Sequence, residues 1–195
     1  MQRAETGDTD EIQSMVDGDK NNLWHHLKPH ACFNTREQMI IVAADGLVVE
    51  DIRGRKYLDA TAGGVWSVLA GYGRNAIADA VCAQMKKMPY FAGVYGTVPA
   101  IRFAGKLLEK LPKMGKVFFS NSGSEANEKA FKMVRQAAHI IPERKGKYKI
   151  LYRNRDYHGT TMGAMSASGQ DLRKKDFGPF MEGFVEFPHC ACYRC

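Results

Sequence analysis

Apolar positions along the chain fall first at helical spacing and then in short β-rich stretches. The first thirty residues carry two helical stripes, formed by Ile12, Met15 and Val16 and by Leu23, Trp24 and Leu27. From Met39 the run MIIVAADGLVVEDIRGRKYLDA is interrupted at Asp45-Gly46 and again at Arg53-Gly54. An Asp-Gly pair between β-branched residues is typical of a hairpin turn. The pattern predicts two or three short strands over residues 39–60.

Two amphipathic helices are predicted after the hairpin. The first runs up to Pro89, because apolar residues recur every three or four positions, at Ile77, Val81, Met85 and Met88. The second begins after Thr97 as its cap, tolerates Pro99 in its first turn and stops at Pro112.

The next segments have the order of a βαβ unit. KVFFSN (116–121) predicts a short buried strand, a long helix follows to about Ile140, and YKILYR (148–153) predicts another strand. Such units build parallel sheets that helices cover, so the α/β class is expected. GFVEF (183–187) predicts a last short strand.

Composition narrows the classes of partner. The chain has 195 residues, 45% apolar and 25% charged, which is enough for one core or for one domain plus a piece of another. No stretch approaches the roughly 18 apolar residues of a membrane helix, and the acidic start lacks the apolar centre of a secretory signal. We therefore expect a cytoplasmic protein with no membrane partner.

The net charge of +7 lies outside the acidic start, since residues 1–20 hold two basic and six acidic side chains. Basic residues gather over 144–155 and 173–175, which is typical of a solvated face. No zinc-finger spacing or RNA-binding aromatic pattern accompanies them, so no nucleic-acid partner is expected. Attraction of small anionic ligands is the favoured functional interpretation.

Five cysteines, an odd number, argue against a disulfide framework. Three of them, Cys190, Cys192 and Cys195, lie with His189 in HCACYRC. Thiolates and an imidazole so close together are compatible with half of a zinc site. A closed structural site needs a second ligand pair, and the sequence shows none, so no metal is expected.

The segment VFFSNSGSEANEKAFKMVRQAA combines a predicted strand end with a helix start at Ser122-Gly123-Ser124. Unpaired amides and the positive end of the helix dipole favour a phosphate there, and Gly123 permits close approach. An ordinary helix cap is the alternative, with Ser122 or Ser124 capping and Glu125 and Glu128 favouring the dipole. Both interpretations stay open. Neither a Walker loop nor Gly-x-Gly-x-x-Gly is present, which disfavours a nucleotide.

The complete string NSGSEANEKAFKMVR resembles the phosphate-binding segment of the class III aminotransferases, fold-type I enzymes that use pyridoxal 5′-phosphate (PLP). DIRGRKYLDATAGGVWSVLAGYG and YHGTTMGAMSASG resemble two further segments of that family, and CYRC is similar to one of its loops. The resemblance covers nearly the whole chain. It implies a helical and β-hairpin segment over 1–70, followed over 71–195 by the incomplete start of the large PLP-binding domain with its parallel or mixed sheet.

The resemblance also implies roles for individual residues. The cofactor phosphate would be held by a phosphate cup made of Ser122, Gly123 and Ser124. The pyridine ring would be covered by Tyr157, with His158 and Gly159 completing that wall; these three residues are called the ring cover. Trp66 would line the substrate pocket. The alternative for Tyr157 and for Trp66 is a plain core aromatic.

In the family, the Schiff-base lysine and the aspartate that pairs with the ring nitrogen follow the YHG segment. Both are therefore expected beyond residue 195, as is the arginine that receives a carboxylate, and no catalytic residue is assigned within the chain. The run most resembles the ω-amino acid:pyruvate group. That likeness implies transfer of an amino group from a donor such as taurine to pyruvate, giving sulfoacetaldehyde and alanine.

The family forms homo-oligomers, dimers or tetramers, with shared active sites, and Tyr95-Gly96 is expected to approach the neighbouring one. Two alternatives remain: another class III enzyme, namely a different ω-transaminase or an aminomutase, and a truncated, non-catalytic chain that acts as a binding module.

Overall fold

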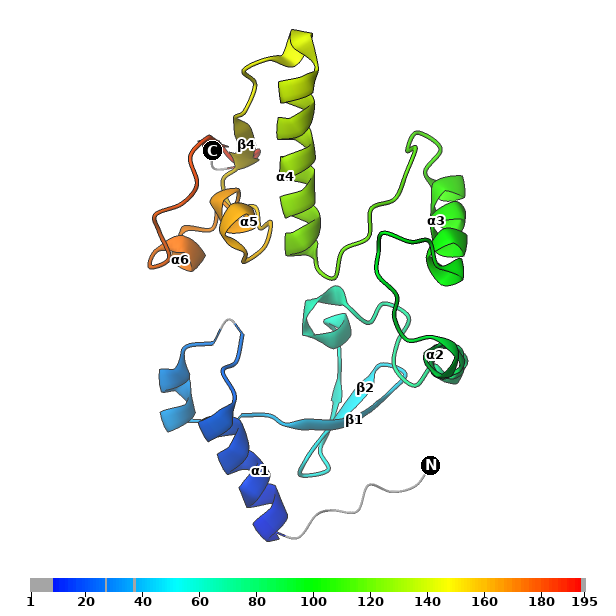
Figure 1. Cartoon of the computed structure of the whole chain (residues 1–195). Coiled ribbons are helices and arrows are strands. Elements are labelled where there is room, and N and C mark those ends of the chain that lie inside the picture. The colour runs from blue at the N-terminus through cyan, green and yellow to red at the C-terminus, as the bar shows by residue number, and fades with distance from the viewer. Residues whose placement is uncertain (1–8, 27, 37, 194–195) are drawn as a thin grey trace. The chain divides into compact units, whose positions relative to one another are not determined.

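The computed structural model describes residues 9–26, 28–36 and 38–193. It divides the chain into two compact units, residues 1–95 and residues 96–195 (Figure 1). The boundary predicted at residue 70, between the N-terminal segment and the large PLP-binding domain, is a boundary between domains of the family. It stays a prediction.

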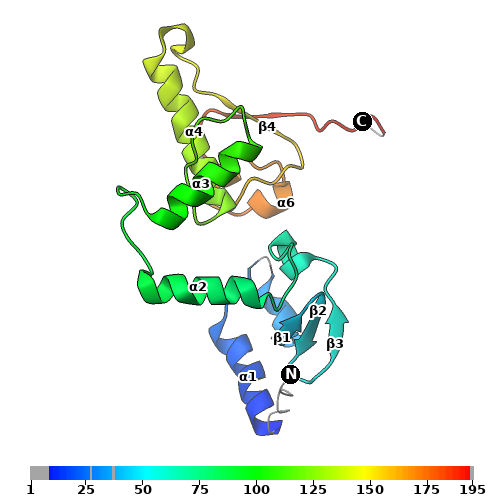
Figure 2. The same cartoon turned by 90° about the vertical axis from the view of Figure 1, so that its right-hand side faces the viewer.

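The first unit is built around a three-stranded antiparallel sheet, whose strands lie side by side in Figure 2. Its elements are α1 (Thr9–Asn22), a 3₁₀ turn (His30–Asn34), β1 (Ile41–Asp45), β2 (Val48–Asp51), β3 (Lys56–Leu58), a π-helical turn (Ala62–Trp66) and α2 (Asn75–Lys87). Asp45 pairs with Val48 across the first turn, where Gly46 has φ +57°. The predicted hairpins and the helix before Pro89 are confirmed.

A buried carboxylate closes the second hairpin turn. The Asp51 side chain is only 1% exposed, and it accepts hydrogen bonds from the amides of Arg53 and Arg55 at 3.0 and 2.9 Å. The Arg55 guanidinium and the Tyr57 hydroxyl donate to its other oxygen, each at 2.8 Å. Burial raises the pKa of Asp51, but these hydrogen bonds together outweigh burial and lower it from 3.8 to about 2.

The second unit contains two of the three strands predicted there, those over 148–153 and 183–187, and they pair in parallel. Its elements are α3 (Val98–Lys110), α4 (Gly123–Ile140), a 3₁₀ turn (Pro142–Arg144), β4 (Ile150–Arg153), α5 (Met162–Ser166), α6 (Asp171–Lys174) and β5 (Phe184–Phe187). β4 and β5 pair in parallel from Ile150 opposite Phe184 to Arg153 opposite Phe187. The α/β class is confirmed, and the helices that connect the paired strands are α5 and α6. Thr97 takes the cap position of α3, without a side-chain hydrogen bond.

The predicted buried strand over 116–121 is wrong for the part of the chain that the structure describes. Residues 116–121 have no strand partner among the described residues, and Phe118 and Phe119 are 65% and 42% exposed. The Phe119 ring stacks on Phe103 of α3 at 5.8 Å, and the Lys129 ammonium lies 4.2 Å from the Phe118 ring centre. A strand exists only where a neighbour accepts its hydrogen bonds, and an apolar pattern does not specify that neighbour.

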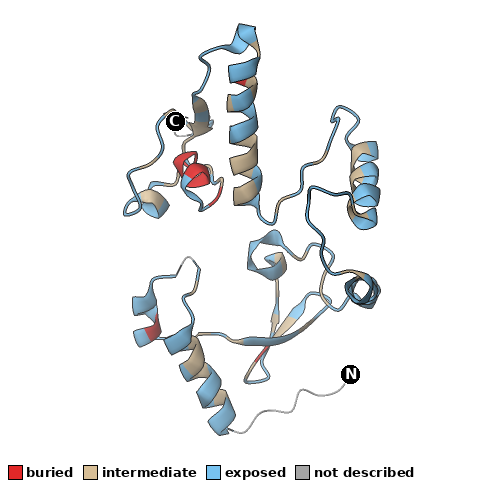
Figure 3. Cartoon of the chain, viewed as in Figure 1, coloured by how far each residue is buried: buried red, intermediate tan, exposed pale blue. Residues whose placement is uncertain are grey.

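The most completely buried segment is α5 and the residues after it, shown in red in Figure 3. Ala164, Ala167 and Ser168 are at most 2% exposed. Small side chains let this segment lie close to its neighbours, so the loop that leads into α5 is joined to a well-packed helix. None of the helices among the described residues has the length and apolar content needed to cross a membrane.

Candidate functional site

The site begins at the first turn of α4. Ser122 has extended backbone angles, φ −148° and ψ 164°, and its hydroxyl accepts a hydrogen bond from the Glu125 amide at 3.2 Å. The Glu125 carboxylate in turn accepts from the Asn121 amide at 2.9 Å. This reciprocal arrangement resembles a capping box and explains why the helix starts here. The interpretation of Ser122 as a helix cap is confirmed.

The cap leaves two amides of the phosphate cup available. Gly123 and Ser124 are the first two residues of an 18-residue helix, so their amides have no carbonyl one turn earlier inside it. No described side chain or loop carbonyl accepts from them either. A Cβ added at Gly123 would meet nothing within 4 Å, so open space lies beside this residue. Free donors, open space and the helix dipole suit an anion.

The ring cover lies directly against the phosphate cup, although more than thirty residues separate them in sequence. The Ser124 hydroxyl accepts a hydrogen bond from the Thr160 amide at 3.1 Å. The Asn127 side-chain amide, one turn further along α4, donates to the His158 carbonyl at 2.6 Å. The structure therefore brings together the two groups of residues that the sequence nominated separately.

Gly159 makes this close approach possible. It is buried with φ +132°, a conformation that side chains with a Cβ rarely adopt. An added Cβ would lie 2.8 Å from Ser124 Cβ and 2.9 Å from Ala164 Cβ, and it would also collide with the Ser124 hydroxyl. Only glycine lets the backbone of the ring cover touch the first turn of α4.

A second set of contacts holds the far side of the loop. The Glu128 carboxylate accepts from the Thr161 hydroxyl at 2.6 Å and from the Ala164 amide at 3.1 Å, so it caps α5. The Ser168 hydroxyl accepts from the His158 amide at 3.0 Å. The expectation that Glu128 favours the dipole of its own helix stays a prediction, and its hydrogen bonds go to the start of α5.

Sequence reasoning missed Asn127 and Ser168 as site residues. Their signal is weak but present: Asn127 follows Ser124 by three positions, so both side chains lie on one face of α4. Ser168 stands in the small-residue run SASG, and its burial is visible only in the structure. Neither observation identifies the partner, which comes from another part of the chain.

Tyr157 presents a half-exposed ring at the end of this loop. Its side chain is 45% exposed, and the Arg173 guanidinium lies 5.2 Å from the ring centre, within cation–π range. The exposure argues against a plain core aromatic. At the base of the loop, Arg153 donates two 3.0 Å hydrogen bonds to Asp156, and this pairing lowers the pKa of Asp156 below its ordinary range.

Trp66 belongs to the first unit and sits at the end of a tight π-helical turn. Its φ is +56°, unusual for a residue with a side chain, and it is 75% exposed. The Asp59 carboxylate shapes this turn by accepting from Thr61, from the Gly63 amide at 2.5 Å and from the Tyr72 hydroxyl at 2.8 Å. Hydrogen bonds from Thr61 and its neighbours hold the pKa of Asp59 well below its ordinary range. A role for Trp66 in a substrate pocket stays a prediction.

Two other features, the cysteines near the C-terminus and a hollow along α4, do not form part of the site. Over residues 9–26, 28–36 and 38–193, no three His, Cys, Asp or Glu side chains gather as metal ligands. Cys190 and Cys192 are exposed there, and Cys195 lies outside the described residues.

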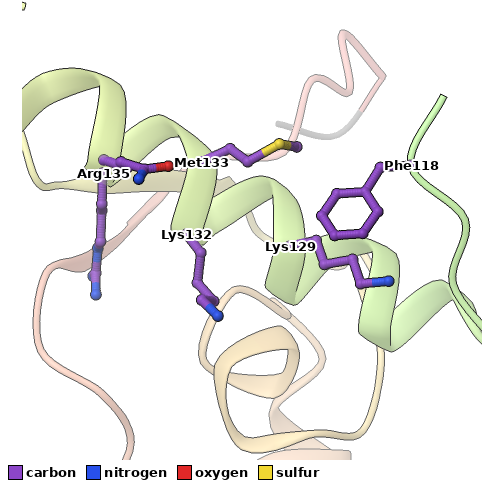
Figure 4. A pocket seen from close by; sticks show the side chains of 6 residues that line it. Phe118, Lys129, Lys132, Met133 and Arg135 are labelled. Carbon is purple, nitrogen blue, oxygen red and sulfur yellow. The ribbon is translucent and has the colours of Figure 1, made fainter. Parts of the chain in front are cut away.

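A hollow of about 570 Å³ lies along α4, lined by Phe118, Lys129, Lys132, Met133, Arg135 and Gln136 (Figure 4). The Lys129 ammonium donates to the Phe119 carbonyl, and the Arg135 guanidinium donates to the carbonyls of Tyr148 and Glu182. The hollow contains none of the predicted site residues.

Comparison with known proteins gives a consistent picture. The family model described as Aminotransferase class-III matches residues 32–193. The hypotaurine/taurine–pyruvate aminotransferase of Paracoccus denitrificans is 50% identical over 184 residues, and the taurine–pyruvate aminotransferase of Bilophila wadsworthia is 54% identical over 176. These alignments cover 94% and 90% of this chain, but 40% and 38% of the relatives.

Among solved structures, an aminotransferase of Bacillus anthracis superposes with a TM-score of 0.87 at 39% identity. The superposition covers 96% of this chain and 41% of that protein. The chain therefore spans about two fifths of the length of the proteins that it matches.

The geometry fits the phosphate and the ring of a PLP-type ligand. Among the described residues no group accepts from two amides of the phosphate cup, and open space lies beside Gly123. The ring cover offers a half-exposed tyrosine on a loop hydrogen-bonded to that same helix turn. An anionic group joined to a flat ring matches both parts of the site, the amide donors of the cup and the tyrosine of the ring cover.

Proposed function

The chain belongs to the class III aminotransferase family, and on that premise we propose that the whole protein is a PLP-dependent transaminase. It moves an amino group from an ω-amino acid such as taurine to pyruvate. Sulfoacetaldehyde and alanine are the products when taurine is the donor. The proposal of taurine rests on the activities that name the relatives, which are about half identical to this chain.

One observation carries the proposal: the joint between the first turn of α4 and the YHG loop. In this proposal the amides of Gly123 and Ser124 and the Ser124 hydroxyl bind the phosphate, while Ser122 holds the helix start. Tyr157 covers one face of the ring, and His158 and Gly159 form the wall beside it. PLP, when bound, supplies an electron sink for the carbon that carries the amino group.

This chain's own residues contribute binding and orientation. A ring stacked on tyrosine gains about 0.5–1.5 kcal/mol beyond area burial, which favours one orientation of the cofactor. The hydrogen-bonded phosphate fixes the other end. We assign no catalytic residue within the chain. A substrate contact by Trp66 and a homo-oligomer with shared sites belong to the same proposal.

The test is an assay of alanine formation by the purified whole protein with PLP, taurine and pyruvate. We expect alanine to appear only when all three are present, and Ser124→Ala to require more PLP for half-maximal rate. Alanine from β-alanine or another amine, but not from taurine, would correct the donor. Failure of the protein to bind PLP at all would refute the proposal and favour a binding module.

A further inference from the structure

The backbone of the ring cover and of the residues after it is held by side chains on both sides. On the α4 side, the Asn127 amide donates to the His158 carbonyl and Glu128 accepts from Thr161 and the Ala164 amide. On the α5 side, the Ser168 hydroxyl accepts from the His158 amide. Both backbone polar groups of His158, its N–H and its C=O, are therefore bound by side chains.

This loop is partly buried, so its backbone polar groups need protein partners. A loop backbone at the surface ordinarily satisfies its polar groups with water at little cost. Here Ser168 is 2% exposed, and Glu128 reaches from one helix to cap another. Buried polar contacts of this kind make one loop conformation preferred over its alternatives, because each unpaired partner would lose a hydrogen bond.

A fixed conformation has a consequence for a rigid ligand. A phosphate at the α4 terminus and a ring against Tyr157 are two ends of one molecule, so the distance between the phosphate cup and the ring cover must match it. Binding groups need their supporting shell to hold them within about 0.5 Å of the productive geometry. The Asn127 hydrogen bond is the most direct link, because it joins the helix of the cup to the wall of the ring.

We propose that Asn127, Glu128 and Ser168 are positioning residues that set the spacing between the phosphate cup and the ring cover. The inference deepens the proposed function and rests on it. None of the three touches the cofactor in this account. Asn127 and Glu128 act from α4 on the loop, and Ser168 acts from the residues after α5.

The test uses near-isosteric variants of the whole protein, so that each loses a hydrogen bond without a change of volume. Asn127→Asp and the uncharged Asn127→Leu both remove the donor to His158 and should weaken binding alike, whereas an effect in Asn127→Asp alone would report its added charge near the phosphate cup. Thr161→Val removes the hydroxyl that Glu128 binds, and Asn127→Gln keeps the amide on a longer side chain. Gln136→Ala is the matched control, because Gln136 is an exposed amide side chain on the same helix. PLP affinity is measured by titration, and the orientation of the bound cofactor by its circular dichroism.

We expect the PLP dissociation constant to rise about three- to tenfold in Asn127→Asp and in Thr161→Val, the factor expected for one hydrogen bond. The dichroism per bound cofactor should fall, and Asn127→Gln should recover part of both. Gln136→Ala should match the wild type. Unfolding of each apo protein in urea shows whether it is folded at the assay concentration, so that lost affinity is not lost folding.

The failures of the two proposals are distinct. If the wild type does not bind PLP, the proposed function itself fails. If the wild type binds PLP and folded Asn127→Asp and Thr161→Val bind it with unchanged affinity and dichroism, the positioning role is overturned. An equal loss of affinity in Gln136→Ala would overturn it as well, since that side chain has no contact with the loop.

Discussion

Replacing Gly159 by alanine should destabilise the protein, whereas the same replacement at Gly123 should not. Both glycines belong to the proposed cofactor site, and both changes add one methyl group. At Gly159 the new Cβ would lie 2.8 Å from Ser124 Cβ and 2.9 Å from Ala164 Cβ. At Gly123 it would meet no atom within 4 Å. The pair therefore separates packing from cofactor binding.

The magnitude at Gly159 has two parts. A backbone φ of +132° costs a residue with a side chain about 1–3 kcal/mol. Carbon atoms in contact prefer separations of about 3.5–4.0 Å, so the added methyl also overpacks the site, at about 1–3 kcal/mol. The expected loss in the free energy of unfolding is about 2–6 kcal/mol. For Gly123, the change should stay below about 1 kcal/mol, because alanine is a better helix former.

The assay is urea unfolding of the whole protein without cofactor, followed by tryptophan fluorescence, for both variants and the wild type. Gly159→Ala should lower the urea midpoint strongly, and Gly123→Ala should leave it near that of the wild type. In a separate titration, Gly123→Ala should bind PLP more weakly, because its methyl group occupies space beside the phosphate amides. A wild-type midpoint for Gly159→Ala would refute the account of the close approach.

Three further predictions follow from single groups. Ser122→Ala removes the cap of α4 and should lower the free energy of unfolding by about 1 kcal/mol, with Ser122→Thr closer to wild type in the same urea assay; equal loss in both would contradict the capping role. The lowered pKa of Asp51 stabilises the folded state above its ordinary value of 3.8, and this contribution is lost as pH falls from there towards 2. Urea midpoints measured across that window should therefore fall less steeply for Asp51→Asn than for wild type, and parallel profiles would show that Asp51 contributes no such linkage. Trp66→Ala should raise the KM for the amine donor while leaving PLP affinity unchanged; a loss of PLP affinity alone would place Trp66 outside the substrate pocket.

Several elements of the fold are local enough for sequence to predict them. The hairpin over 41–51 follows from Asp45-Gly46, because a tight turn needs a residue that tolerates positive φ. The start of α4 follows from Ser122 and Glu125, because the Glu125 amide donates to Ser122 and the Glu125 carboxylate accepts from the Asn121 amide, all within residues 121–125. Phosphate-cup and ring-cover residues were likewise nominated from short strings, through their resemblance to a family.

Other features depend on partners that are distant in sequence. The run 116–121 looks like a strand by its apolar residues, but no described neighbour pairs with it. Glu128 looks like a residue that serves its own helix, yet it caps α5. In both cases the side chain or backbone group has more than one favourable use, and the local pattern does not choose among them.

The sequence alone was enough to locate the start of α4 and the YHG loop, because cap and turn preferences depend on only a few neighbouring residues. Only the tertiary structure decided that these segments touch. The contact needs Gly159 to have no Cβ, Asn127 to face the His158 carbonyl and α5 to pack beneath the loop. Such conditions join residues about thirty positions apart, and they are met only when the whole unit is folded.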